Sequence, residues 1–344
     1  MAPARLLRDA AYPKSDAAGL RALGEHLLLL AACAVLAEWS IVGRVLQPVA
    51  FIFLFCPSHE CVHRTAFRRR ALNDAVGFLI GVLLILPPAW FGAFHVAHHK
   101  HTQDPARDPE IRWSGFTRAD IRKTGPRAWN DRLWALSGAG YWKERVATTL
   151  MYACGTVPAA DLNFVHTERL ARRLVREARL FVAIYALVLA VAAAGGGAPL
   201  WRHWGFPALA GQPFLRFYLT AEHTGCELAH EPPPAAARQP ADAREALRRG
   251  QRLSRTSARH IWPRAATRLL FWNMPYHAEH HAFPEVPFAH LPALSAALHD
   301  ADAQREEDSE RRGCRGEGLL SAYWHDLRAA GKLSSSVPSS GRGL

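Results

Sequence analysis

The sequence predicts an all-α, multi-pass membrane protein with four transmembrane helices in two hairpins and a cytoplasmic helical cap. Three observations lead to this fold class: long segments without charged residues, Arg and Lys concentrated between these segments, and three histidine clusters far apart in the chain. Hydrophobic residues make up 49% of the 344 residues, which is enough for a large buried core.

The chain divides into three parts. Residues 1–24 carry acidic side chains and lack the apolar core and cleavage signal of a secretory peptide, so we expect a cytoplasmic segment. Residues 25–300 hold the apolar segments and the histidine clusters and are expected to form one membrane domain. Residues 301–344 are first highly charged and then rich in serine, which predicts a partly disordered tail.

The first predicted hairpin comes from Leu27–Ala37 and Val45–Pro57, which are both free of charged residues. Each run is short for a bilayer crossing of about 20 residues, but each can be extended through its amphipathic ends. Trp39 between the runs suits the membrane interface. The two runs therefore predict a tight transmembrane hairpin, and a pair of buried soluble helices is the alternative.

The second predicted hairpin begins with Phe181–Trp201, which has no charged residue and is long enough to cross a membrane alone. A short Gly-rich turn flanked by tryptophan follows, and Gly205–Ala221 returns. Arg216 interrupts the returning segment, and we expect its long side chain to reach out to the membrane interface.

The segment Ala75–Phe94 is also uncharged and long enough to cross, yet it lies between the first two histidine clusters. A single crossing would put these clusters on opposite faces of the membrane and prevent them from sharing a metal. Pro87 and Pro88 would break a continuous helix here. We therefore expect the segment to dip into the membrane and return on the same side, where surrounding protein covers its backbone.

A further apolar stretch, Ala147–Ala160, is interrupted by Gly155 and Pro158 and is followed by the Arg-rich HTERLARRLVREAR. This pattern predicts an amphipathic helix that lies at the membrane interface.

The charge distribution predicts which side of the membrane each part faces. The chain has 42 Lys and Arg against 30 Asp and Glu, a formal net charge of +12. Basic residues are dense between the two hairpins and after Arg244, whereas the turns near residues 40 and 200 have few. By the positive-inside rule, both termini and the middle section are cytoplasmic, and much of the positive charge serves topology and anionic lipids. We therefore expect an integral protein of a bacterial inner membrane that binds no nucleic acid.

Three histidine clusters are candidates for one shared metal site. HECVH carries one pair, and FHVAHH and YHAEHH repeat the spacing H-x-x-H-H, which a chain with 18 histidines in 344 residues does not readily repeat by chance. On a helix, residues i, i+3 and i+4 share a face, so each cluster can converge on one point. The clusters contribute His59, His63, His95, His98, His99, His277, His280 and His281.

The number of imidazoles favours two metal ions over one. Zinc is satisfied by three or four protein ligands, whereas two iron ions would use eight or nine and keep a position open for O2. His223, in TAEHTGC at the end of the last predicted crossing, lies at the right depth to be a ninth ligand. His101 and His290 adjoin the clusters but are out of phase with them, which favours roles at the surface or behind the ligands.

Carboxylates among the clusters can orient the ligating rings through the second ring nitrogen. The candidates are Glu60, Glu222, Glu279, Asp104 and Asp108. Asp104 and Asp108 also stand in DPARDPE, where Asp-Pro favours turns, and the two roles are compatible.

In this order, HECVH, HVAHH and YHAEHH resemble the three histidine boxes of the membrane fatty acid desaturase and hydroxylase superfamily. The resemblance extends from about Leu27 to Pro292. It implies a four-crossing membrane enzyme with a cytoplasmic di-iron centre, which uses O2 and electrons from a redox partner to attack a C–H bond of a lipid. Carried over to this chain, the iron ligands are the eight histidines of the clusters, and His223 matches an extra histidine before the last box.

The resemblance leaves several reactions open. EHTG at Glu222–Gly225 resembles membrane alkane hydroxylases, and HHKHTQDP and EHHAFPEVP resemble carotenoid ketolases. The final box, WNMPYHAEHHAFPEVPF, is more similar to acyl-lipid and sphingolipid desaturases, so we expect desaturation of a fatty acyl chain before hydroxylation or ketolation. Phe271, Trp272 and Met274 are candidates for the lining of a substrate tunnel, and packing against the membrane helices is the alternative.

The electrons are expected to come from a separate protein. The six cysteines are scattered without a C-x-x-C pair, so neither a disulfide framework, a zinc ribbon nor a rubredoxin motif is indicated, and no flavin or haem motif is present. The basic cytoplasmic surface would attract an acidic carrier such as a ferredoxin.

Two other classes of protein fit parts of the pattern. HECVH matches the zinc protease motif H-E-x-x-H, in which Glu60 would be the general base, but six clustered histidines would then have no role. A metal carrier or channel with a histidine-rich cytoplasmic site is the non-enzymatic alternative. The identity of the bound metal distinguishes a zinc protease from a lipid-oxidising enzyme. Oxygen consumption with a lipid substrate would exclude a metal carrier or channel.

Overall fold

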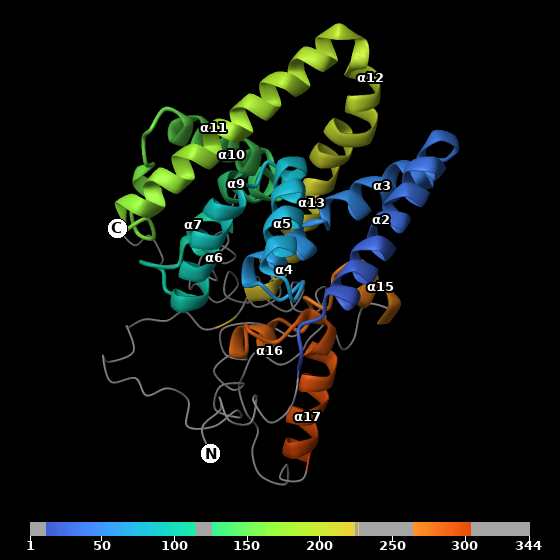
Figure 1. Ribbon diagram of the computed structural model, residues 1–344, viewed down its shortest axis with the longest axis vertical. Coiled ribbons are helices and arrows are strands. Elements are labelled where there is room, and N and C mark those ends of the chain that lie inside the picture. The colour runs from blue at the N-terminus through green and yellow to red at the C-terminus, as the bar shows by residue number, and fades with distance from the viewer. Residues whose placement is uncertain (1–11, 115–125, 224–225, 227–263, 304–344) are drawn as a thin grey trace, which may run out of the picture.

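The computed structural model describes residues 12–114, 126–223, 226 and 264–303. Every regular element within these ranges is a helix, as the sequence predicts (Figure 1). Residues 1–11 of the predicted N-terminal segment and residues 304–344 of the predicted tail lie outside the described residues.

The helices α2 (Asp16–Trp39) and α3 (Ile41–Ile52) fold back on each other through a very short turn. Ser40 ends α2, and its hydroxyl accepts the backbone N–H of Val42 at 3.1 Å, which caps α3. The helices meet so closely at Gly43 that a Cβ there would lie 2.3 Å from the backbone nitrogen of Ala37. Only glycine permits this approach, so α2 and α3 are closely packed.

The helix α4 (Phe55–His63) continues the direction of α3 into the protein interior and carries the first histidine pair. Together, residues Ile41–His63 are long and apolar enough to cross a membrane. The helix ends at Arg64, whose left-handed backbone (φ 64°) turns the chain toward α5.

The helices α5 (Arg70–Leu84) and α6 (Pro88–His101) are bent by 96° at a short break, so Ala75–Phe94 does not form one straight helix, as the sequence predicts. Ile85 adopts a left-handed conformation (φ 52°), and the N–H of Leu86 donates to the carbonyl of Gly81 at 2.8 Å. Pro88 then begins α6, where its missing N–H costs nothing. The bend returns the chain to the first histidine pair.

The next segment contains α7 (Pro109–Ser114), α9 (Pro126–Ser137), α10 (Ala139–Ala153) and the 3-10 turn η1 (Ala159–Asp161). The prediction of a helix over Ala147–Ala160 was wrong in its bounds, since α10 starts earlier and ends before Gly155, which has φ 88°. Arg145 is buried over the Trp90 ring at 3.4 Å, while Leu150 is exposed. Tyr152 is also buried, and Lys143 and Glu144 are exposed, so both faces of α10 mix polar and apolar side chains.

The last long helices are α11 (Glu168–Val191) and α13 (Phe206–His223), joined by the π-helical turns η2 (Ala192–Gly196) and η3 (Trp201–Gly205) on either side of α12 (Gly197–Leu200). The chain bends at Gly195, whose φ of 106° is open to glycine and strained for other residues. The sequence had placed this bend after Trp201. The run of three glycines therefore sets the turn, and the tryptophans belong to the returning arm.

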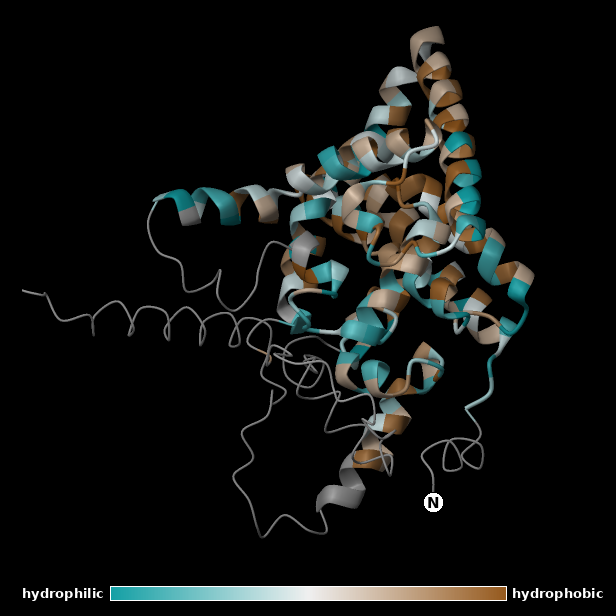
Figure 2. Cartoon of the chain, turned by 90° about the vertical axis from the view of Figure 1, so that its left-hand side faces the viewer, coloured by the Kyte–Doolittle hydropathy of each residue, from teal (hydrophilic) through white to brown (hydrophobic). Residues whose placement is uncertain are grey.

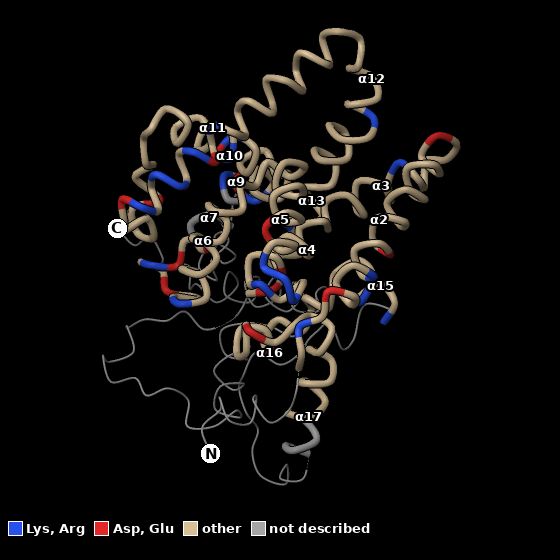
Figure 3. The backbone as a smooth tube through the Cα atoms, in the orientation of Figure 1, with Lys and Arg blue, Asp and Glu red and all other residues tan. Residues whose placement is uncertain are grey.

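Among the described residues, three helices are long and apolar enough to cross a membrane, or up to four if the bent pair α5–α6 forms one span. Hydrophobic residues run along the upper helices in Figure 2, and charged residues are sparse there in Figure 3. The bends of both long helix pairs lie at one end of the molecule, and α16 and α17 lie at the other (Figure 1).

The C-terminal described part contains α15 (Arg264–Leu269), α16 (His277–Ala282), the 3-10 turn η4 (Phe288–His290) and α17 (Leu291–Ala303). Before α16, Trp272 and Asn273 adopt left-handed conformations (φ 48° and 57°). The Asn273 amide donates to the carbonyl of Phe288 at 2.9 Å, and the Trp272 indole N–H donates to His26 Nδ1 at 3.3 Å. These bonds hold α16 against the membrane helices, and they give the buried His26 a structural role that the sequence did not reveal.

Candidate metal centre

The structure brings the nine predicted histidines together, eight of them in two adjoining groups and His277 beside the second group. One group contains His59, His63, His95, His99 and His280, and the other contains His98, His223 and His281. Within each group, the possible ligand nitrogens lie within 4.8 Å of one another. His277 adjoins the second group, because its Nε2 lies 3.1 Å from the Nε2 atoms of both His223 and His281.

The two groups share a border at His99. Its ring stacks on the ring of His281 at 4.2 Å between centroids, and its Nε2 lies 3.0 Å from that of His95 and 3.2 Å from that of His280. Two ligands at right angles around one metal, each at about 2.1 Å, lie ~3 Å apart. The spacing of these three nitrogens therefore fits one metal ion, and the 3.1 Å spacing of His277 to His223 and to His281 fits a second ion beside it.

The ring nitrogens need a ligand that the described protein does not provide. Among the ring nitrogens of these histidines, six are buried and have no hydrogen-bond partner within the described residues: His59 Nδ1 and Nε2, His63 Nε2, His98 Nε2, His277 Nδ1 and His280 Nδ1. Burial, followed by neighbouring positive charge, holds the pKa of His277, His280 and His281 well below the usual value. Neutral imidazoles with free lone pairs are the metal-binding form, so the donor set fits the proposed metal ions.

One carboxylate, Asp108, is bonded to the histidines more directly than the others. Its Oδ1 lies 2.9 Å from Nδ1 of His98, and its other oxygen accepts the backbone N–H of Gln103 at 2.8 Å. Glu110 Oε2 lies 3.3 Å from the same His98 nitrogen. Sequence reasoning missed Glu110, although its place two residues after Asp108 in DPARDPE was a signal.

Two further carboxylates lie beside ring nitrogens at longer distances. Glu60 Oε1 is 3.4 Å from His59 Nδ1, and Glu222 Oε1 is 3.6 Å from His277 Nδ1. Two hydrogen bonds hold the Glu60 carboxylate: its Oε2 accepts one from the Thr65 hydroxyl at 2.6 Å and one from the N–H of Phe288 at 3.3 Å. Both carboxylates lie beside the rings, as the sequence predicts, but neither forms a hydrogen bond with the ring nitrogen in this structure.

The remaining predicted carboxylates act elsewhere. Glu279 accepts the hydroxyl of Ser295 at 2.6 Å, which ties α16 to α17. Asp104 accepts the backbone N–H groups of Ala106 and Arg107 at 2.9 and 3.1 Å, so it has the turn-forming role. His290 lies away from the clusters and contacts the carbonyl of Pro13 at 3.2 Å.

A cavity of about 50 Å³ adjoins the histidines. Its apolar wall comes mainly from Phe55, Leu86, Phe91, Phe94 and Met274. Of the three predicted tunnel residues, only Met274 lines this cavity. Phe271 packs against Phe53 at 4.6 Å, and Trp272 packs against Phe288 at 4.5 Å between ring centroids.

The geometry disfavours a zinc protease site at HECVH. The first two histidines of this motif share their group with three others, whereas a catalytic zinc site uses three protein ligands and an open position. Glu60, the general base of such a site, instead accepts hydrogen bonds from the Thr65 hydroxyl and the Phe288 N–H.

A comparison with protein families decides the class of protein. The family model described as fatty acid desaturase matches residues 32–308, which is most of the chain. The chain belongs to the fatty acid desaturase family. Membership supports an oxidoreductase in a membrane, and it accounts for the candidate spans and the histidine clusters together.

Curated relatives of this family member act in different ways. It is 35% identical over 124 residues to the sn-1 oleoyl-lipid 12-desaturase of Anabaena variabilis, and the match covers 31% of this chain and 35% of that protein. It is 29% identical over 119 residues to the probable fatty acid desaturase DES1 of Sorghum bicolor, covering 34% of this chain and 29% of that protein. It is 34% identical over 82 residues to the zeaxanthin 4-ketolase of Chlamydomonas reinhardtii, covering 22% of this chain and 18% of that protein. The matches thus span about a third or less of the length of these relatives.

Proposed function

We propose that this desaturase family member is an O2-dependent di-iron membrane oxidoreductase that desaturates a fatty acyl chain. The observation that carries the proposal is the pair of adjoining histidine groups beside a largely apolar cavity. The ligands would be the eight histidines of the three clusters, with His223 as the ninth.

The reaction would remove two hydrogens from adjacent carbons. One O2, two electrons and two protons enter, a C=C bond forms, and two water molecules leave. Two bound iron ions would supply the chemistry that activates O2. The protein's own part is placement: Phe55, Phe91 and Phe94 exclude water from the cavity, and Asp108 fixes the ring of His98.

The proposed topology has four crossings, formed by α2, α3 with α4, α11 and α13. The bent pair α5–α6 would enter and return, so that all three histidine clusters lie at the cytoplasmic face of a bacterial inner membrane. This arrangement is supported by the bends of both long helix pairs, which lie at the end of the molecule remote from α16 (Figure 1).

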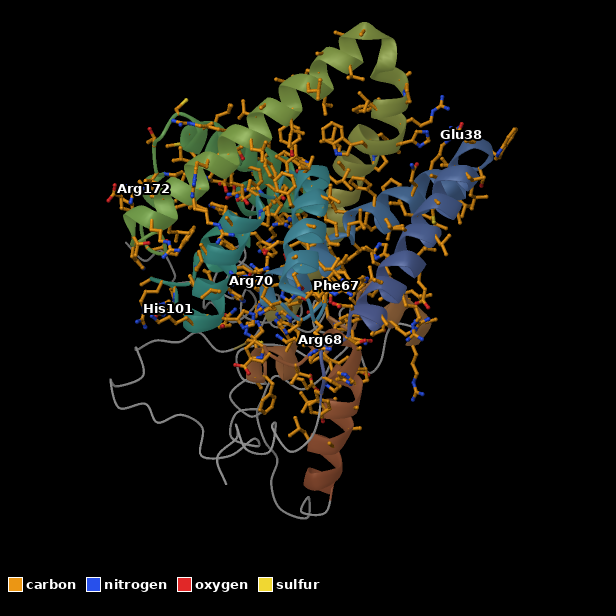
Figure 4. All side chains as sticks on the ribbon, viewed as in Figure 1. Glu38, Phe67, Arg68, Arg70, His101 and Arg172 are labelled. Carbon is orange, nitrogen blue, oxygen red and sulfur yellow. The ribbon has the colours of Figure 1, made fainter. Side chains whose placement is uncertain are left out.

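The electron donor would be a separate acidic protein such as a ferredoxin. Exposed arginines follow the first histidine pair in the sequence, with Arg68 and Arg69 in the loop after α4 and Arg70 at the start of α5 (Figure 4). Electrostatic attraction to this surface should weaken as salt rises. Turnover under limiting donor should therefore fall with ionic strength, and salt-independent turnover would contradict the donor assignment.

Hydroxylation or ketolation of a lipid is the second candidate, because the chain also matches a zeaxanthin ketolase over 82 residues. Both begin with the same hydrogen removal, and placement of the neighbouring C–H then decides the product.

Mass spectrometry of lipids and carotenoids from cells with and without the protein separates the candidates. Desaturation predicts a product that has lost two hydrogens, and a main product with one added oxygen would favour the second candidate. His281→Ala should abolish the new product, whereas His203→Ala, which changes an exposed histidine in η3, should not.

A further inference from the structure

Arg216 is a cation within an otherwise apolar helix, and it points toward the protein interior. The sequence predicted that its side chain reaches out to the membrane interface, and this was wrong. Arg216 instead lines the cavity that His59, His95 and His277 also line. A charged side chain inside a membrane helix is costly and commonly marks a functional site.

The guanidinium of Arg216 is held in place by an aromatic ring. Its Cζ lies 4.7 Å from the centroid of the Tyr141 ring, which belongs to α10. Its Nε is buried and has no hydrogen-bond partner among the residues that the structure describes. A buried donor without a partner destabilises the empty cavity, so an acceptor that enters it gains a strong interaction.

Each of the two acidic residues that line the cavity lies close to a ring nitrogen of a histidine. Glu110 lies 3.3 Å from Nδ1 of His98, and Glu222 lies 3.6 Å from Nδ1 of His277. Glu110 also attracts Arg216 through its charge, but no described residue forms a hydrogen bond with Nε of Arg216, which is left to face the space in which a substrate would lie.

We propose that Arg216 receives a carbonyl or carboxylate oxygen of the substrate, so that the oxidised carbon lies close to the polar end of a lipid. This inference rests on the proposed function and specifies its substrate class. An arginine suits such an oxygen because its fork of N–H donors matches a carboxylate or a carbonyl.

The size of the cavity supports proximity between the oxygen and the reacting carbon. The same space of about 50 Å³ is lined by the histidines at one side and by Arg216 at another. A chain with an oxygen at Arg216 would present its nearest carbons to the histidines. A purely hydrocarbon chain would leave the guanidinium buried and unsatisfied, which costs affinity.

Binding of three labelled probes to the full-length protein in lipid nanodiscs tests the proposal. The probes are hexadecanoic acid, methyl hexadecanoate and hexadecane, with empty nanodiscs as the blank. Hexadecanoic acid or its ester should bind about tenfold or more tightly than hexadecane, since a charge-assisted hydrogen bond is worth about one order of magnitude. Tight binding of the acid alone would identify a carboxylate, and equal binding of acid and ester a neutral carbonyl. Equal affinity for hexadecane would overturn the proposal.

Variants assign the preference to one side chain. Arg216→Leu should remove the preference for the acid or ester over hexadecane, and Arg216→Lys should keep part of it. Arg202→Leu should leave this preference intact, because Arg202 pairs with Glu38 and does not line the cavity. An unchanged preference in Arg216→Leu would also overturn the proposal. If that variant does not fold, the comparison of probes on the wild-type protein still decides.

Iron analysis of the same preparations distinguishes a failure of the Arg216 role from a failure of the proposed di-iron function. Protein with about two iron ions but no preference for an oxygen-bearing probe would refute the role of Arg216 alone. Protein that takes up no iron would refute the proposed function itself.

Discussion

The Nδ1 of His98 lies 2.9 Å from Oδ1 of Asp108, and both side chains are fully enclosed by protein. Burial acts to raise the pKa of Asp108, but the charge and hydrogen bond of His98 outweigh it and lower that pKa. Asp108 is therefore an anion that fixes the His98 ring with Nε2 toward the second histidine group.

We expect Asp108→Asn to weaken metal binding by about 10- to 100-fold, because an amide holds the ring in place less firmly than a carboxylate does. Metal titration of the purified variant measures this loss. Asp74→Asn is the matched control, since Asp74 pairs with Arg64 at the surface. Unchanged metal affinity in Asp108→Asn would show that the ring needs no such support.

We expect His223→Ala to lose one of two iron ions and keep the other. His223 belongs to the group with His98 and His281, while the other group keeps all five of its histidines. Metal analysis by mass spectrometry should therefore give about half the wild-type iron. Full iron content in this variant would mean that His223 is not a ligand.

Much of the site could be predicted because its spacing is local. His95, His98 and His99 share a helix face, and the periodicity of a helix alone brings their rings together. The bend after Leu84 followed from Pro87 and Pro88 and from the need for two clusters to meet.

Other features depend on packing between distant segments, which periodicity does not encode. Arg216 turns inward because Tyr141, from another helix, offers its ring. Likewise His26 is buried through bonds to Ala50 and Trp272, which lie 24 and 246 residues away in sequence. The turn at Gly195 was misplaced because glycine and tryptophan signals stand side by side.

Acid should release the metal and destabilise the protein. The pKa values of His277, His280 and His281 are lowered in the fold, so below about pH 6.5 the unfolded chain binds protons that the folded chain does not. Their contribution to stability is complete above about pH 6.5 and is lost as the pH falls toward the lowered values. Iron retention and thermal melting measured from pH 8 to 5 should decline together below pH 6.5, and metal retained down to pH 5 would contradict a histidine-bound site.

Cysteine labelling in whole cells tests the proposed topology. Labels should reach the histidine end only from the cytoplasm and the hairpin tips only from outside; Glu38 marks a tip and Arg68 the opposite end in Figure 4. Trp39→Cys, 86% exposed at the tip, is the outside position. The cytoplasmic positions are Arg68→Cys, Lys100→Cys and Glu285→Cys, in a background where the exposed Cys154 and also Cys314 are replaced by serine. Outside labelling at Lys100→Cys would mean that α5 and α6 form a true crossing and would exclude a shared site.

The metal content of the wild-type protein, purified gently in detergent, tests the central claim most directly. Eight or nine imidazoles in two adjoining groups predict about two iron ions per chain. One zinc ion per chain and no iron would contradict the di-iron centre and with it the proposed reaction.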